Sequence, residues 1–294
     1  MTKVSVLMPA FNAEEYIGTA IESVVKQSYT NWELLIIDDC SADKTGSICD
    51  QFAIHDKRIQ VIHLNRNVGI SEAKNIGLQN ATGEYIAFCD DDDQMHMDSL
   101  RDNVNLVERY HPQIVRWSYE RIDVDENGVI VGRKDRNCRD GVYLDRDAIF
   151  RNYDNVHSVL SCDWTGLYER SFLKKNDIWF NKEFTYGGED TEFNLSALQY
   201  VEKMVMNSKC YYKWYLRRMH STTAKRNIVF CSSMIEVAQK EYSLIGNHEL
   251  AKGFWKDYEA YYKKYILNYA KGLNGKERKY VDGIMSNDNW YKTA

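Results

Sequence analysis

Four consecutive carboxylates, Asp90 to Asp93, are the residues of this sequence that most directly imply chemistry. Mutual repulsion makes such a run costly unless a cation neutralises it, and oxygen ligands are those that Mg²⁺ and Mn²⁺ prefer. Such a cation offsets the charge that builds on a departing diphosphate. A solvated acidic loop is the alternative interpretation of an aspartate run. Because this run directly follows an apolar stretch predicted as a buried strand, 85–89, we favour the cation site.

A second acidic cluster, Asp38-Asp39, also follows an apolar run and is succeeded by Ser41, Asp43 and Thr45. Ser41 and Asp43 suit a turn or a helix cap, which is a purely structural role. Its position at a strand end makes Asp39 a candidate ligand-binding residue.

The segment Gly187-Gly188-Glu189-Asp190 is predicted to open a helix. Glycines give the backbone freedom, and a carboxylate at a helix N-terminus is electrostatically favoured, so either acid could be a simple cap. A general base must be a positioned carboxylate able to accept a proton from a hydroxyl. From the segment alone the helix cap is favoured, and the general base is the alternative.

Short β-branched runs alternate with helical patterns through the first part of the chain. Strands are predicted at 4–8, 32–37, 59–64 and 85–89, and helices at 13–27, 45–55, 71–79 and 98–110. Asn12 and Glu15 have the spacing of a capping box for the first helix. Such alternation predicts an α/β fold with a doubly wound, mainly parallel sheet, which binds ligands beyond the carboxyl ends of its strands. The acidic clusters follow those ends.

Beyond Tyr110 the pattern changes. Strand-like runs occur at 114–119, 121–124 and 129–131, with Glu126-Asn127-Gly128 as a hairpin turn, then a helix at 190–200 and an aromatic-rich strand or strand pair at 204–216. From about Ile228 the pattern is helical. No G-x-G-x-x-G follows the first strand and no G-x-x-x-x-G-K-S/T is present, which disfavours a dinucleotide dehydrogenase and a P-loop NTPase.

The composition narrows the class further. The 294 residues carry a net charge of −5, so no broad basic surface for nucleic acid is expected. Seven scattered cysteines without a C-x-x-C pair favour free thiols in a reducing cytoplasm. No signal peptide or membrane span is expected, so we predict a cytoplasmic location, with peripheral binding to the inner face of the cell membrane as an extension of it.

Ordered motifs of this chain resemble those of the family 2 glycosyltransferases, which have the GT-A fold. The matching segments are Val6-Leu-Met-Pro-Ala-Phe-Asn12, Asp38-Asp-Cys-Ser-Ala-Asp-Lys-Thr45, Asn67-Val-Gly69, Ala73-Lys-Asn-Ile-Gly77, Gly83 to Asp93, Trp164-Thr-Gly-Leu-Tyr168 and Gly188-Glu-Asp190. The resemblance extends over about residues 3–220. Lys74 stands where relatives usually have arginine, which leaves a point charge in place of a planar fork.

The resemblance implies roles for these residues. Asp190 would be the general base, Asp92 a metal ligand, and His220 a further candidate ligand for Mn²⁺ or Mg²⁺. Trp164, Gly188 and Glu189 would shape the acceptor and sugar site. The nucleotide-sugar donor, a UDP-sugar by resemblance, would be bound by Pro9, Phe11, Asn12, Asp39, Lys74, Asp90 and Asp91, with Phe11 stacked on the uracil and Lys74 near that ring.

We therefore expect an inverting glycosyltransferase that moves a sugar to a hydroxyl of a glycan or lipid-linked acceptor in surface polysaccharide or lipopolysaccharide synthesis. The expected organisation is a catalytic domain at 1–225, with a nucleotide-binding half (about 1–110) and an acceptor-binding half (111–225), and a helical extension at 226–294. A catalytically silent nucleotide-sugar-binding or scaffold subunit is the main alternative, and a nucleotidyltransferase ranks third. The identity of the sugar, the acceptor and the linkage is not readable from the sequence.

Aromatic residues recur at helical spacing in the last part of the chain, with lysines between them: Phe254, Tyr258, Tyr261, Tyr262, Tyr265 and Tyr269. One interpretation is an amphipathic helix on an anionic membrane surface. The other, which we favour, is a helix packed on the catalytic domain or on a second copy of the chain.

Overall fold

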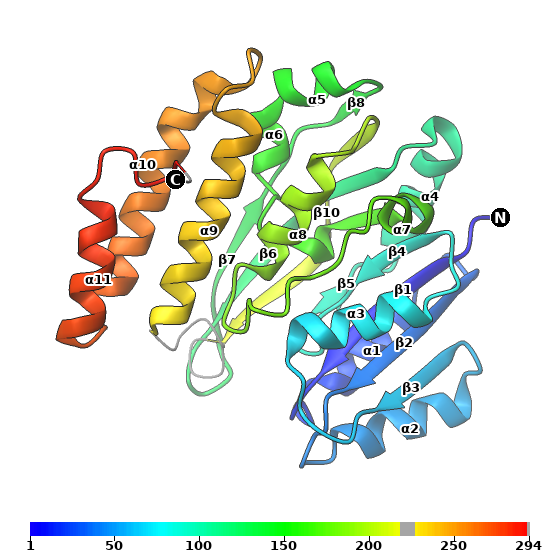
Figure 1. Cartoon of the computed structure of the whole chain (residues 1–294). Helices are drawn as coiled ribbons and strands as arrows, with labels where there is room; N and C mark the ends of the chain where they lie inside the picture. Colours follow the sequence, from blue (N-terminus) through cyan, green and yellow to red (C-terminus); the bar gives the residue numbers. More distant parts are fainter. Residues whose placement is uncertain (218–226, 293–294) are drawn as a thin grey trace.

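The computed structural model describes residues 1–217 and 227–292, and these form one ten-stranded sheet flanked by helices (Figure 1). The strands are β1 (Val4–Ala10), β2 (Trp32–Asp38), β3 (Ile59–His63), β4 (Tyr85–Phe88), β5 (Gln94–Met95), β6 (Ile114–Val124), β7 (Ile130–Arg136), β8 (Gly141–Tyr143), β9 (Gly166–Glu169) and β10 (Met204–Arg217). The helices are α1 (Ile17–Val25), α2 (Thr45–His55), α3 (Ile70–Asn80), α4 (Ser99–Tyr110), α5 (Arg146–Arg151), α6 (Tyr153–His157), η1 (Asp163–Thr165, a 3₁₀ turn), α7 (Arg170–Lys175), α8 (Glu189–Leu198), α9 (Ile228–Ile245), α10 (Lys252–Ala270) and α11 (Gly275–Met285).

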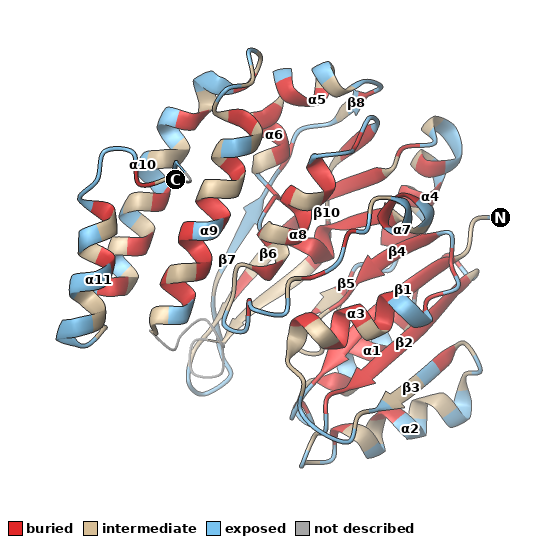
Figure 2. Cartoon of the chain, in the orientation of Figure 1, coloured by how far each residue is buried: buried red, intermediate tan, exposed pale blue. Residues whose placement is uncertain are grey.

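The order of strands along the sheet is β3-β2-β1-β4-β9-β6-β10-β5, with β7 paired to β6 and β8 to β10. The first four strands pair in parallel, as the sequence predicts. They are apolar and buried on both faces in β1, β2 and β4, which is the pattern of a sheet covered on both sides (Figure 2). The α/β prediction is therefore confirmed. Beyond β4 the sheet becomes mixed, because β9 pairs antiparallel with both β4 and β6.

The predicted hairpin is present as an antiparallel β6–β7 ribbon, and Gly128 supplies the positive φ (78°) that its turn requires. One prediction about the first helix is wrong. The helix begins at Ile17 rather than near Ala13, and its N-terminus has no side-chain cap. The reason is that Asn12 Oδ1 accepts the backbone N–H of Ala42 (2.8 Å), while its own N–H donates to Ser41. Asn12 thus ties two loops together instead of capping a helix.

The helices α9, α10 and α11 lie on the side of the molecule away from β1–β3 (Figure 1). The aromatic face of α10 packs inward, as we favoured: Tyr262 is 3% exposed, and Phe254, Tyr258, Tyr265 and Tyr269 pack against the core. Tyr261 is the exception at 56% exposed. Within the described ranges, no helix is both long and apolar enough to cross a membrane.

Candidate active site

The acidic clusters predicted from the sequence gather at one edge of the sheet. In the parallel register Ala10 of β1 is opposite Asp38 of β2, and β4 runs beside β1, so the loops after these strands are neighbours. The backbone N–H of Phe11 donates to Asp91 Oδ2 (2.9 Å), which joins the first loop to the acidic run. Pro9 is buried at the end of β1, whereas Phe11 is 48% exposed beside the edge.

The Asp38-Asp39 pair organises the loops around it. Asp38 bonds His63 on β3 (2.8 Å). Asp39 is 3% exposed and accepts the backbone N–H groups of Val68 (2.7 Å) and Gly69 (2.9 Å), which fixes the entry into α3. Since each of its oxygens already accepts one bond, a contact with the donor would use the remaining lone pairs, and that contact stays a prediction.

The aspartates after β4 are held separately. The backbone N–H of Asp90 donates to the Tyr212 hydroxyl (3.0 Å), Asp92 forms an ion pair with Arg217 (2.9 Å), and Asp93 accepts the N–H of Tyr215 (2.8 Å). Burial raises the pKa of Asp90 to about 7, against the opposing effect of the Lys74 ammonium. Burial, reinforced by the charge of Asp92, raises the pKa of Asp91 well above its usual range. The cluster therefore carries an electrostatic cost that a cation would relieve.

Two observations test whether these residues fit a divalent cation. The side-chain oxygens Asp90 Oδ1 and Asp93 Oδ2 are buried and have no hydrogen-bond partner within the described part of the chain. Over the same residues, no three His, Cys, Asp or Glu side chains are arranged as a metal cage. Unpartnered carboxylate oxygens are the donor type that Mg²⁺ and Mn²⁺ prefer, so the acidic run could contribute to such a site, and the cation stays a prediction. His220, the second predicted ligand, lies outside the described residues.

Asp190 lies on the first turn of α8, and its side chain is 18% exposed. Its Oδ1 is 2.9 Å from Lys74 Nζ, and the same ammonium is 2.7 Å from Asp163 Oδ2. Burial would lower the pKa of Lys74, but the charges of Asp163 and Asp190 raise it well above its usual value. Lys74 is thus a permanent cation beside a partly open carboxylate. Its predicted contact with the donor base stays a prediction, because here the ammonium is committed to two carboxylates.

The helix that carries Asp190 begins where the glycines predict. Gly188 is the N-cap residue with φ +92°, a conformation that side chains rarely adopt. Glu189 is 9% exposed, and its Oε2 has no partner among the described groups. Burial and the charge of Asp190 raise the pKa of Glu189 to about 7, although Lys74 acts in the opposite direction. Glu189 and Asp190 thus sit in different environments, one nearly enclosed and the other partly open.

Trp164 is connected to the acidic run through the side chain of Tyr212. It is 4% exposed and stacks on Tyr212 (centroids 4.4 Å apart, 19° between planes), whose hydroxyl accepts the N–H of Asp90. Its predicted role in shaping the acceptor site stays a prediction, since burial leaves little of the indole accessible.

Sequence reasoning missed three residues of this site: Asp163, Arg116 and Arg217. Asp163 is a single acid in a short turn, and its sequence context gives no signal. Arg116 is the single charged residue in the buried first half of β6, 114–119, which is an anomaly that could have identified it. It is buried and bonds Tyr168, Asn194 and Thr165 around η1. Arg217 falls in a segment whose sequence gives no indication of a partner 125 residues away.

The family follows from comparison with known sequences. A sequence model described as Glycosyl transferase family 2 matches residues 5–177. This match covers more than half of the chain, and the chain belongs to this family of glycosyltransferases.

Individual relatives agree. A Bacillus subtilis (strain 168) protein described as uncharacterized glycosyltransferase EpsJ is 27% identical over 241 residues, which cover 81% of this chain and 67% of that protein. Glycosyltransferase GlyA of Streptococcus pneumoniae serotype 4 (strain ATCC BAA-334 / TIGR4) is 28% identical over 220 residues, which cover 74% of this chain and 31% of that protein. The chain therefore spans between 31% and 67% of the length of these two relatives.

Solved structures support the fold. The crystal structure of S. aureus TarS 1-349 in complex with UDP-GlcNAc aligns with a TM-score of 0.68 at 23% identity, covering 96% of this chain and 80% of that one. The structure of the same fragment described without a ligand gives a TM-score of 0.68 at 22% identity, with 96% and 79% covered. The expected architecture, a central sheet flanked by helices with a helical C-terminal region, is confirmed.

Proposed function

We propose that this glycosyltransferase moves a sugar from a nucleotide-diphosphate donor, with a UDP-sugar as the first candidate, to a hydroxyl of a glycan or lipid-linked acceptor. The proposed reaction inverts the configuration at the anomeric carbon. Its proposed setting is the synthesis of cell-surface polysaccharide.

One observation carries the proposal: a partly exposed carboxylate, Asp190, is paired with a fully buried ammonium at the edge where the acidic loops meet. A general base must be ionised and held in position before it can accept a proton. The Lys74 ammonium fixes Oδ1 of Asp190 through a 2.9 Å contact, which leaves the other oxygen of Asp190 for a hydroxyl.

In the proposed step, the acceptor hydroxyl gives its proton to Asp190 while its oxygen bonds the anomeric carbon. The bond from that carbon to the diphosphate oxygen breaks, and its electron pair leaves with the nucleoside diphosphate. A single displacement converts an α-linked donor into a β-linked product. A divalent cation at the acidic run, for which Asp92 is the predicted ligand, would supply charge that stabilises the departing diphosphate.

The names of relatives support the donor class and the setting. A relative of 27% identity over 216 residues, from S. aureus (strain Mu50), is described as poly(ribitol-phosphate) beta-N-acetylglucosaminyltransferase TarS. A second, 41% identical over 104 residues, is described as a putative teichuronic acid biosynthesis glycosyltransferase, TuaG, of B. subtilis (strain 168). The β-linkage in the first name is the product expected from a single displacement on an α-linked donor.

The test is nucleotide release from a panel of UDP-, GDP-, CMP- and dTDP-sugars in the presence of Mn²⁺, Mg²⁺ or EDTA, with UDP-GlcNAc measured first. We expect release from one UDP-sugar, lost in EDTA and in Asp92→Ala. Asp190→Asn should bind UDP like the parent but lower transfer by about 10²–10⁴-fold, which is the range of general-base contributions. Transfer at the parent rate by Asp190→Asn would refute the base assignment. Absence of both release and metal-dependent UDP binding would favour the silent-subunit alternative.

A further inference from the structure

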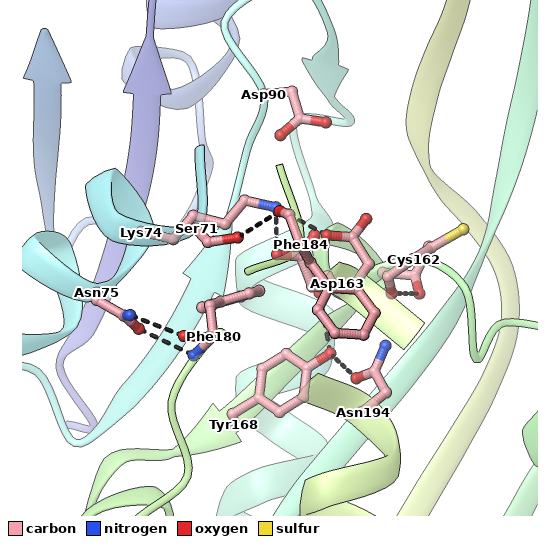
Figure 3. A network of polar contacts seen from close by, with 12 residues as sticks. Ser71, Lys74, Asn75, Asp90, Cys162, Asp163, Tyr168, Phe180, Phe184 and Asn194 are labelled. Atoms are coloured by element: carbon pink, nitrogen blue, oxygen red, sulfur yellow. Dashed lines mark hydrogen bonds and ion pairs between the residues drawn. The ribbon is translucent and has the colours of Figure 1, made fainter. Parts of the chain in front are cut away.

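The Lys74 ammonium contacts a second carboxyl group, that of Asp163, which has no role in the proposed step so far. Asp163 lies on η1, and its Oδ2 is 2.7 Å from Nζ of Lys74 on α3 (Figure 3). The other partner of that ammonium, Asp190, comes from α8. The side chain of Asp163 is 0% exposed and that of Lys74 is 1% exposed. Asp163 therefore cannot meet solvent, and among the described residues the cation in contact with it is the ammonium that also holds Asp190.

The turn that carries Asp163 is itself held by hydrogen bonds from buried side chains. The buried guanidinium of Arg116, on β6, bonds Thr165 Oγ1 (2.7 Å) and the carbonyl of Cys162, the residues on either side of the Asp163–Trp164 step. The Tyr168 hydroxyl donates to the Asp163 carbonyl (3.1 Å). The turn that carries Asp163 is consequently held by hydrogen bonds from the buried side chains of Arg116 and Tyr168.

Four carboxyl groups face a single ammonium: Asp163, Asp190, Asp90 and Glu189. Burial and the charge of Asp190 raise the pKa of Asp163 well above its usual range, against the effect of Lys74. Asp163 Oδ2 lies 2.7 Å from the Lys74 ammonium, and Asp190 Oδ1 accepts a hydrogen bond from the same ammonium (2.9 Å). The position of Asp163 therefore limits where the ammonium that meets Asp190 can lie.

We propose that Asp163 is a positioning residue: it holds the Lys74 ammonium in the place where that group orients Asp190 toward the acceptor hydroxyl. This inference rests on the proposed function, because it assigns Asp163 to the site that removes the acceptor proton. Asp163 itself touches neither the acceptor nor the donor in this role, and the bonds made and broken are those of the step described above.

The kinetic test compares two substitutions at Asp163 in the full chain. Asp163→Leu removes the carboxyl oxygen that contacts the Lys74 ammonium, so the ammonium can shift. A displacement of about 1 Å can cost about 10²-fold, and we expect kcat for release of nucleotide from the active UDP-sugar to fall by about 30- to 100-fold with KM within about threefold of the parent. Asp163→Asn keeps a carbonyl oxygen for Lys74 and should recover at least about tenfold of that loss. Equal kcat values for the two variants, or a parent-like kcat in Asp163→Leu, would overturn the proposal.

A matched control is Glu241→Gln. Glu241 is also 0% exposed and hydrogen-bonded, but to Tyr153 and Tyr262 beside the C-terminal helices. Its kcat should equal that of the parent. A loss of kcat there equal to the loss in Asp163→Leu would show that removing any buried carboxylate disturbs the site, and would overturn a specific role for Asp163.

A measurement without turnover separates this inference from the proposed function. The Lys74 Nζ resonance, assigned by ¹⁵N NMR with Lys74→Arg as the reference lacking it, should move in Asp163→Leu and stay close to the parent position in Asp163→Asn. An unchanged resonance in Asp163→Leu would overturn the positioning role even if the enzyme transfers sugar. A moved resonance together with neither nucleotide release nor metal-dependent UDP binding would refute the proposed reaction while supporting the geometry. If Asp163→Leu does not fold, Asp163→Ser replaces it, because its shorter hydroxyl ends before the ammonium.

Discussion

Replacement of Lys74 by methionine should destabilise the fold, because it leaves two carboxyl groups without their cation. The Lys74 side chain is 1% exposed, and its partners Asp163 and Asp190 are 0% and 18% exposed, so solvent screens the pair weakly. Removing one partner of a buried ion pair costs about 3–5 kcal/mol. We take the lower end, about 3 kcal/mol, because a buried carboxyl group that loses its cation can be neutralised by taking up a proton. At roughly 2 °C per kcal/mol for a chain of this size, Tm should fall by about 6 °C at pH 7.5.

The pH dependence of this loss has a definite sign. A carboxyl group whose pKa is raised in the folded state contributes stability that is present below its unfolded pKa and lost as pH rises through the folded pKa. The pKa of Asp163 is already raised in the parent, and removal of the cation raises it further. The difference in Tm between parent and Lys74→Met should therefore be larger at pH 8 than at pH 5.

Lys182→Met is the control, since Lys182 Nζ is also 2.7 Å from a carboxylate, that of Glu72, but its side chain is 63% exposed. An exposed pair contributes about 0–1 kcal/mol, so Tm should hardly change. Differential scanning calorimetry of both variants and the parent would measure the shifts. If Tm falls by less than about 2 °C in Lys74→Met, or by equal amounts in both variants, the buried contacts of Lys74 with Asp163 and Asp190 do not stabilise the fold as argued.

Three further predictions concern stability. Burial raises the pKa values of Asp90 and Glu189 to about 7. By the same sign rule, the stability that these two groups contribute to the fold falls as pH rises through 6–8. Over this pH range the Tm of Asp90→Asn, measured by calorimetry, should therefore fall less than that of the parent. Gly188→Ala places a side chain at φ +92° and a Cβ 3.2 Å from Phe184, and should cost about 1–2 kcal/mol in urea unfolding. Glu241→Leu removes the acceptor of two buried tyrosine hydroxyls and should cost roughly 2–4 kcal/mol in the same assay, with Glu241→Gln less affected.

Each of these has its own contradicting result. A steeper loss of Tm with pH in Asp90→Asn would reverse the sign argument for that carboxyl group. Parent-like stability of Gly188→Ala would mean that the turn before α8 relaxes without strain. Equal losses for the leucine and glutamine variants of Glu241 would show that packing, rather than hydrogen bonding, sets its contribution.

Much of the fold could be predicted because its signals are local. The β-branched runs and the helical periods between them place β1 to β4 and α2 to α4 within a few residues of the observed bounds. Gly188 predicts the start of α8, since few other residues adopt its backbone conformation. The aspartates after β4 could be placed at the ligand-binding edge because strand direction in a doubly wound sheet follows from right-handed crossovers.

Other features depend on residues that are distant in the chain. Asn12 has the local spacing of a capping box, yet its side chain bonds Ala42, 30 positions later, because that loop lies beside it in the folded sheet. The antiparallel insertion of β9 between β4 and β6 gives the sheet its mixed half, and no local pattern encodes which strands become neighbours.

By itself, the sequence determined the alternating architecture, the acidic edge and the glycine turn that presents Asp190, since each depends on the conformational or charge preferences of adjacent residues. The tertiary structure alone decided that Lys74 joins Asp190, 116 positions away, and that Asp163 contacts the same ammonium. It also decided that Arg217 meets Asp92 across 125 positions. The physical reason is that a buried ammonium is stable only beside carboxylates. Which carboxylates lie beside it depends on how the whole sheet and its helices pack, rather than on any one segment.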